Sequence, residues 1–188
     1  SAAGCLIIEA TAINPEGRIS HGCLGLYTDR NEADLAKTLN EVRKYSRIPI
    51  GIQLGHAGRK ASVNTPWNGG SPLTTAANSW QTVAPSAEAF DVGWHCPMRL
   101  NTKNMESIIQ NLVAATKRAT RLNLDLVELH CAHGYLFSQF LSPISNKRCD
   151  KYGGNLTNRM RFPLKAAEQM RQIWPKTKPM GIRLNGTD

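Results

Sequence analysis

The most informative segment of the sequence is LDLVELHCAHGY, residues 124–135. Its apolar first part, residues 124–130, predicts a buried β-strand. Two histidines and a tyrosine follow where that strand ends, at His130, His133 and Tyr135. Because a strand end can direct neighbouring side chains into one pocket, this segment indicates both an element of the fold and a candidate site.

Three more strands and three helices are predicted around this segment. Apolar runs predict strands at residues 5–8, 49–54 and 180–184, the first two of them buried. Apolar residues at helical spacing predict helices at residues 31–45, 104–122 and 156–173. Asp29 or Asn31 is expected to cap the first helix, and Asn155 the last. Strands and helices therefore alternate, which is typical of a parallel α/β sheet.

The ends of the strands favour a barrel over a doubly wound sheet. No G-x-G-x-x-G motif follows the first strand, as a dinucleotide-binding sheet would require. Polar residues instead follow every strand, where a (β/α)8 barrel places its active site. We therefore predict a (β/α)8 TIM barrel of which about four βα units are present, in one partial domain spanning 1–188. The Pro-, Gly- and Trp-rich stretch at about 55–103 is expected to be a long functional loop. A second loop is expected after the strand at residues 124–130, up to Gly154.

Composition excludes several classes of function. The formal net charge of +9 is scattered rather than gathered in a basic stripe, which argues against nucleic acid and fits a phosphate-bearing cofactor. No apolar run approaches the ~20 residues of a membrane span, and no secretory leader is apparent. The five cysteines are odd in number and lack a C-x-x-C spacing. A reducing, cytoplasmic location is expected.

The cluster at residues 130–135 allows two chemistries besides a structural role. Zinc is not expected, because a fourth ligand is missing nearby and adjacent strand residues such as His130 and Cys131 point to opposite faces. Two imidazole N–H groups could instead hold one carbonyl or anionic oxygen, while the phenol of Tyr135 supplies a proton to carbon. That arrangement would activate an electron-poor alkene.

These residues resemble the old yellow enzyme family. The resemblance is carried by residues 130–136 (HCAHGYL), 139–143 (QFLSP), 145–148 (SNKR), 150–162 (DKYGGNLTNRMRF), 9–12 (EATA), 17–19 (GRI) and 53–60 (QLGHAGRK). The last of these blocks is most similar to the bacterial branch that includes xenobiotic reductases. The resemblance implies a barrel that binds FMN and takes electrons from NADPH or NADH. It also implies hydride transfer from flavin N5 to the C=C bond of an α,β-unsaturated carbonyl or nitro compound.

The resemblance implies a role for six residues. His130 and His133 would bind the substrate oxygen, and Tyr135 would donate a proton to the α-carbon. The residues implied at the flavin are Ala10 packing beside the ring, Gln53 at the pyrimidine edge and Arg183 near N1 and O2. Glu9 and Glu128, which lie near strand ends, are expected to have structural roles instead.

The resemblance also implies that this chain is a central part of a barrel. Its strands would be the second to fifth, so that the first strand, the last three and the phosphate-binding segments are expected outside it. Two alternatives stay open: a dienoyl-CoA reductase-like flavoenzyme with an iron–sulfur cluster, and a truncated non-catalytic ligand-binding remnant. A homo-oligomer is also open.

Overall fold

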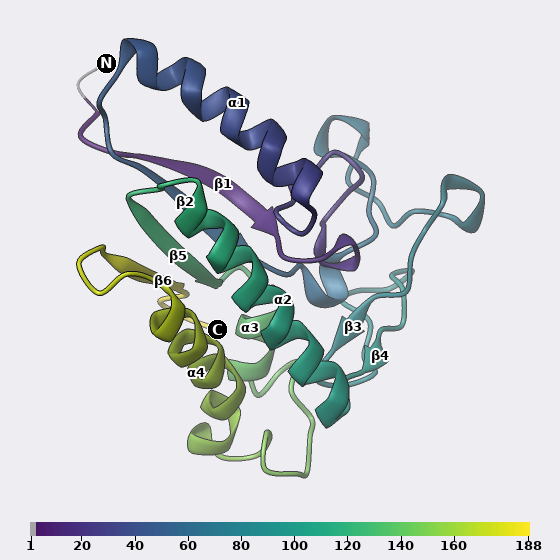
Figure 1. Cartoon of the computed structure of the whole chain (residues 1–188). Coiled ribbons are helices and arrows are strands. Elements are labelled where there is room, and N and C mark those ends of the chain that lie inside the picture. The colour runs from purple at the N-terminus through teal and green to yellow at the C-terminus, as the bar shows by residue number, and fades with distance from the viewer. Residues whose placement is uncertain (1–2) are drawn as a thin grey trace.

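The computed structural model describes residues 3–188, and its centre is a four-stranded parallel sheet. The strands lie in the order β1 (Leu6–Ala12), β2 (Ile50–Gly55), β5 (Leu126–Cys131) and β6 (Met180–Leu184). Helices α1 (Asp29–Tyr45), α2 (Thr102–Arg121) and α4 (Leu156–Ile173) connect them and lie on the same side of the sheet (Figure 1). The predicted βαβαβαβ order and α/β class are confirmed.

The two faces of the sheet differ because strand side chains alternate. On β2, Ile50, Ile52 and Leu54 are buried in the apolar core shared with the helices. The residues between them, Gly51 and Gln53, therefore point to the opposite face. That second face carries the small and polar residues, so it is the face available to a ligand.

Each long helix begins at a side-chain cap. Thr28 caps α1 by accepting a hydrogen bond from the backbone N–H of Asn31, which corrects the predicted caps Asp29 and Asn31. Thr28 precedes the helix and has extended backbone angles, as a capping residue requires. Asn101 caps α2, and Asn155 caps α4 as predicted.

The first strand differs from its prediction in burial and length. Leu6 and Ile7 are 49% and 46% exposed, so the expectation of a buried run at residues 5–8 is wrong. The reason is that β1 is an edge strand, paired on one side only. An irregularity in pairing between Ile8 and Thr11 lets the strand continue to Ala12. Ala10 is thereby carried into the end of the strand.

Two segments predicted as loops contain short elements. Residues 56–101 gather near the ends of β1 and β2 and include the short parallel pair β3 (Val83–Ala84) and β4 (Met98–Arg99) (Figure 1). The six-residue helix α3 (Leu136–Leu141) follows β5 directly, where a loop was predicted. Of the helices within residues 3–188, none is long and apolar enough to cross a membrane.

Candidate active site

Three rings converge at the end of β5. The ring centroids of His130 and His133 lie 5.1 Å apart, and those of His130 and Tyr135 also lie 5.1 Å apart. The His133 and Tyr135 centroids are 6.4 Å apart, so the three rings form a triangle of edge-to-face contacts. The structure therefore brings together all three residues that the sequence predicts as catalytic.

The position of His130 follows from the alternation of β5. Cys131 is 3% exposed and belongs to the core on the helix side, so the preceding His130 points to the opposite face. Gly55 of β2 lies against it, because a Cβ on this glycine would come within 3.0 Å of the His130 Cβ. The absent side chain at position 55 leaves the space in which the imidazole is held.

A left-handed turn returns the chain toward His130. His133 has a φ of 57° and Gly134 a φ of 68°. Only the glycine adopts such a conformation without strain, so other contacts must hold His133. One is the hydrogen bond from its backbone N–H to Oδ1 of Asn185, at 2.8 Å. Tyr135 then starts helix α3 as its N-cap residue.

Hydrogen bonding assigns the proton of His130. The backbone N–H of Ala132 donates to its Nδ1 at 3.2 Å, so the neutral ring carries its proton on Nε2. Burial, together with the positive charges of His133, Arg183 and Lys60, lowers the pKa of His130 to about 4. His130 is therefore a neutral N–H donor at physiological pH.

The three residues predicted at the flavin lie around this triangle on the other strands. Arg183 of β6 is the register partner of His130, and Gln53 of β2 is the partner of Glu128. The side-chain amide of Gln53 donates to Oε1 of Glu128, which places this carboxylate in the structural network expected of it. Ala10 shares a small cavity with His130 and Tyr135.

The site contains more positive than negative groups. The side chain of Arg183 is exposed, and among residues 3–188 its guanidinium forms no hydrogen bond or ion pair. Glu128 is the carboxylate on the same face of β5 and is already bonded to Gln53. A free guanidinium beside a carboxylate that is already bonded suits an electron-rich or anionic ligand.

Comparison with known proteins identifies the family. The whole chain, residues 1–188, matches the profile of the FMN oxidoreductases, described as the NADH:flavin oxidoreductase / NADH oxidase family. The chain belongs to this family. It is 42% identical over 185 residues to an NADPH dehydrogenase of Clostridium acetobutylicum, covering 98% of this chain and 50% of that protein. It is 39% identical over 189 residues to an NADH:flavin oxidoreductase of Gibberella zeae, covering 98% of this chain and 46% of that protein.

Solved structures of the family agree with the fold. Morphinone reductase, solved with tetrahydroNAD, superposes with a TM-score of 0.80 at 32% identity, over 95% of this chain and 50% of that one. An old yellow enzyme homologue from Zymomonas mobilis superposes with a TM-score of 0.79 at 25% identity, over 95% of this chain and 49% of that one. The chain thus spans about half the length of the relatives that it matches. The predicted family and partial barrel fold are confirmed, and the description of the family agrees with the predicted FMN and nicotinamide reductant.

The residues present fit a flavin of this family. The face of the sheet opposite the helices, called the inner face below, has small residues at Ala10 and Gly55. A flat ring has room beside them. The guanidinium of Arg183 is free to pair with an electron-rich edge, and the amide of Gln53 can both donate and accept. Small residues, a free guanidinium and a side-chain amide on one face are the features that such a cofactor needs.

Three supporting residues of this family member carry no role in the sequence-based prediction. Gln139 is 1% exposed, and its amide donates to the backbone oxygens of Gly134 at 2.7 Å and Ala57 at 3.3 Å. Asn185 holds the backbone of His133, and Lys60 donates to the carbonyl of His133 at 3.0 Å. Their positions in the sequence could have indicated them. Lys60 and Asn185 lie shortly after strand ends, and Gln139 lies one helical turn beyond Tyr135.

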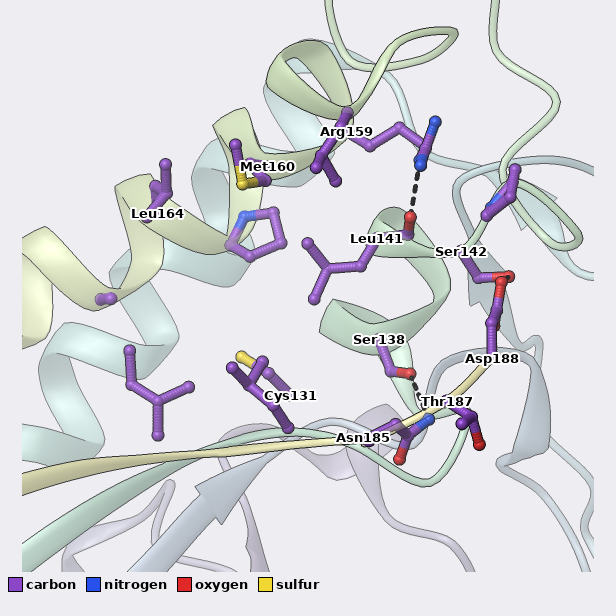
Figure 2. Close-up of a pocket in the computed structure, with 17 residues that line it drawn as sticks. Cys131, Ser138, Leu141, Ser142, Arg159, Met160, Leu164, Asn185, Thr187 and Asp188 are labelled. Carbon is purple, nitrogen blue, oxygen red and sulfur yellow. Dashed lines mark hydrogen bonds between the residues drawn. The ribbon is translucent and has the colours of Figure 1, made fainter.

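A larger cavity lies on the other side of β5 and β6. It has a volume of about 460 Å³ and is lined mostly by apolar residues of α3, α4 and β6 (Figure 2). Cys131 points into it, away from the histidines, and burial raises the pKa of its thiol to about 12. Within residues 3–188, no three His, Cys, Asp or Glu side chains gather in a metal-binding arrangement.

Proposed function

We propose that the protein is an FMN-dependent enzyme that reduces the C=C bond of α,β-unsaturated carbonyl or nitro compounds with electrons from NADPH or NADH. The observation that carries the proposal is the triangle of His130, His133 and Tyr135 at the end of β5. The free thiols of all five cysteines agree with a cytoplasmic enzyme. The four βα units would form part of a complete eight-stranded barrel.

Three residues of the inner face would hold the cofactor. Ala10 would pack beside the flat ring, Gln53 would hydrogen-bond its pyrimidine edge, and Arg183 would neutralise charge near N1 and O2. When bound, reduced FMN supplies the hydride. Because a fixed guanidinium favours the reduced, negatively charged form, Arg183→Leu should lower the flavin midpoint potential by tens of millivolts, measured by redox titration.

The two histidines would bind and polarise the substrate. His130 carries its proton on Nε2 and stays neutral above a pKa of about 4, so it can donate to a carbonyl or nitro oxygen. His133 lies beside it and supplies the second donor. Two donors at one oxygen withdraw electron density from the conjugated C=C bond and stabilise the enolate-like charge that develops on that oxygen.

Tyr135 would complete the reduction. After the β-carbon has received hydride, the phenol Oη transfers its proton to the α-carbon, and the product is the saturated carbonyl or nitro compound. Burial raises the pKa of Tyr135, which keeps the phenol protonated until this transfer. The phenolate left behind regains its proton from solvent.

The decisive experiment uses the full-length protein. We expect a yellow protein whose flavin absorbance is bleached by NADPH without oxygen and restored by 2-cyclohexenone. Tyr135→Phe should be bleached at the normal rate and restored at least about tenfold more slowly, the usual range of a general acid. A colourless protein would favour the non-catalytic alternative, and reoxidation by dienoyl-CoA but not by cyclohexenone would favour the dienoyl-CoA reductase-like one.

A matched pair of histidine variants tests the binding step. His130→Ala should weaken the binding of a phenol inhibitor by about ten- to hundredfold, the value of a hydrogen bond to a charged oxygen. His21→Ala is the control, because His21 is exposed and lies outside the triangle. Equal affinity in the two variants would contradict the proposed role of His130.

A further inference from the structure

Lys60 connects the long loop to the three rings. It is half-buried, and its ammonium group donates to the backbone oxygen of His133 at 3.0 Å. The same Nζ lies 5.1 Å from the ring centroid of Tyr135 and 4.8 Å from that of Phe90. The cation is therefore held between an aromatic ring of the loop and the ring of the predicted proton donor.

The charge of Lys60 is not balanced by a carboxylate. Among the carboxylates of the described chain, residues 3–188, none forms an ion pair with it. Burial and the neighbouring Arg59 both lower the pKa of Lys60. A half-buried cation in such a place destabilises the fold unless other groups compensate for it, here two aromatic faces and a carbonyl. Its position therefore calls for a functional explanation.

We propose that Lys60 is a positioning residue of this site, whose ammonium group holds the His133 carbonyl and stabilises the negative charge that Tyr135 acquires on losing its proton. This inference rests on the proposed function, because it assigns Lys60 a part in the proton-transfer step. It goes beyond that function by adding a residue that acts through Tyr135 without touching the substrate.

The groups that face Tyr135 single out Lys60. The ring of Tyr135 contacts the imidazoles of His130 and His133, and Arg18, Cys23 and His56 line the same small cavity. The guanidinium of Arg18 is bound to the carbonyl of Pro15 and lies over the ring of Trp80, and burial keeps His56 neutral. His130 is neutral at physiological pH, and Cys23 raises rather than lowers the pKa of the phenol. An ammonium ion near an aromatic ring interacts more favourably with phenolate than with phenol, because the phenolate adds a full negative charge to the electron-rich ring face.

The hydrogen bond to His133 supports the positioning role of Lys60. His133 has left-handed backbone angles, which an imidazole-bearing residue adopts only under constraint. Its N–H is held by Asn185 and its carbonyl by Lys60, so contacts on both sides of the residue fix the turn. The same ammonium group thus positions the backbone of His133 and stabilises the phenolate form of Tyr135.

The test measures the ionisation of Tyr135 itself. The full-length protein is labelled with 3-fluorotyrosine, and the signal of residue 135 is assigned by its loss in Tyr135→Phe. Its pKa is then followed by ¹⁹F NMR in Lys60→Met, Lys60→Gln and Lys60→Arg. Lys37→Met is the matched control, because Lys37 is an exposed lysine paired with Asp34 on α1.

We expect the pKa of Tyr135 to rise by about one unit in both neutral variants and to return in Lys60→Arg. In single turnovers, alkene reduction should slow by about tenfold in Lys60→Met while flavin reduction by NADPH keeps its rate. An unchanged Tyr135 pKa in the neutral variants, or a shift that Lys60→Arg fails to reverse, would overturn the inference. The NMR titration needs no cofactor, so it decides on Lys60 even if the protein proves not to reduce alkenes.

Discussion

Gly55 lies directly against His130, so close that a Cβ on the glycine would come within 3.0 Å of the histidine's own Cβ. The contact joins the end of β2 to the end of β5, the two central strands of the sheet. It is tighter than ordinary van der Waals packing, so a methyl group at position 55 must push His130 aside. The position of the imidazole therefore depends on a residue that has no side chain.

We expect Gly55→Ala to weaken phenol binding by about tenfold, because small displacements of a positioned donor are costly. The effect on the free energy of unfolding should be small, since a strand residue has backbone angles that alanine adopts readily. Gly186→Ala is the control, because nothing lies within 4 Å of a Cβ at that glycine. Isothermal titration of both variants compares them, and equal affinities would show that His130 is not held by this contact.

The sequence predicted the site better than it predicted the supports of the site. The strand at residues 124–130 and the cluster that follows it were visible because periodicity and residue chemistry are local signals. The left-handed turn at His133 was not, because it depends on Asn185 from another strand and Lys60 from the loop. Helix α3 was missed for a related reason, since its six residues are fewer than a periodic pattern needs.

The burial of the first strand was mispredicted because burial is not a local property. An apolar run predicts a strand, and the strand expected at residues 5–8 is present. It is longer than expected, because it extends from Leu6 to Ala12. Whether Leu6 and Ile7 are covered depends on which strand lies at the edge of the sheet, and pairing shows that β1 does. Tertiary neighbours, rather than the run itself, decide the exposure of these side chains.

The stability of the protein should fall at acid pH because of His56. This residue is fully buried, its Nδ1 accepts the backbone N–H of Gly58 at 3.0 Å, and burial lowers its pKa to about 3. Between that value and the ordinary histidine pKa of about 6.5, the unfolded chain binds a proton that the folded chain does not. The free energy of unfolding therefore rises with pH across this window, and the contribution of neutral His56 to stability is lost as the pH falls.

His56→Asn should remove this dependence, because asparagine can accept the same N–H group and does not titrate. We expect its free energy of unfolding to vary less steeply between pH 5 and 6.5, by up to about 1.4 kcal/mol per pH unit, a limit approached near pH 5. His130, whose pKa is also lowered, should leave a residual slope in the variant. Urea unfolding at several pH values measures the slopes, with His21→Asn as the exposed control, and parallel slopes for the wild type and His56→Asn would contradict the prediction.

Arg148 should be the most sensitive position in the support of the long loop. Its guanidinium is buried and donates to the backbone oxygens of Pro85 at 2.9 Å and Leu100 at 2.7 Å, and it also pairs with Asp150. Arg148→Leu leaves two buried carbonyls without partners and removes one of the partners of Asp150, which keeps Arg99 and the backbone N–H of Tyr152. We therefore expect a loss of about 3–5 kcal/mol in the free energy of unfolding. Arg148→Lys should not recover it, because one ammonium cannot span the three acceptors. Chemical denaturation checks both, with exposed Arg161→Leu expected within about 0.5 kcal/mol of the wild type.

Cys131 should be the least reactive thiol within this chain, although it adjoins the candidate catalytic His130. It faces the helix side of β5, is 3% exposed, and has a pKa raised to about 12 by burial. At pH 8 its thiol is therefore protonated, while the exposed Cys5, Cys96 and Cys149 are open to reagent. Iodoacetamide labelling followed by peptide mass spectrometry should modify these three first and Cys131 only after urea is added. Early labelling of Cys131 would mean that its side chain reaches solvent, and the opposite orientation of His130, which the proposed chemistry requires, would then be in error.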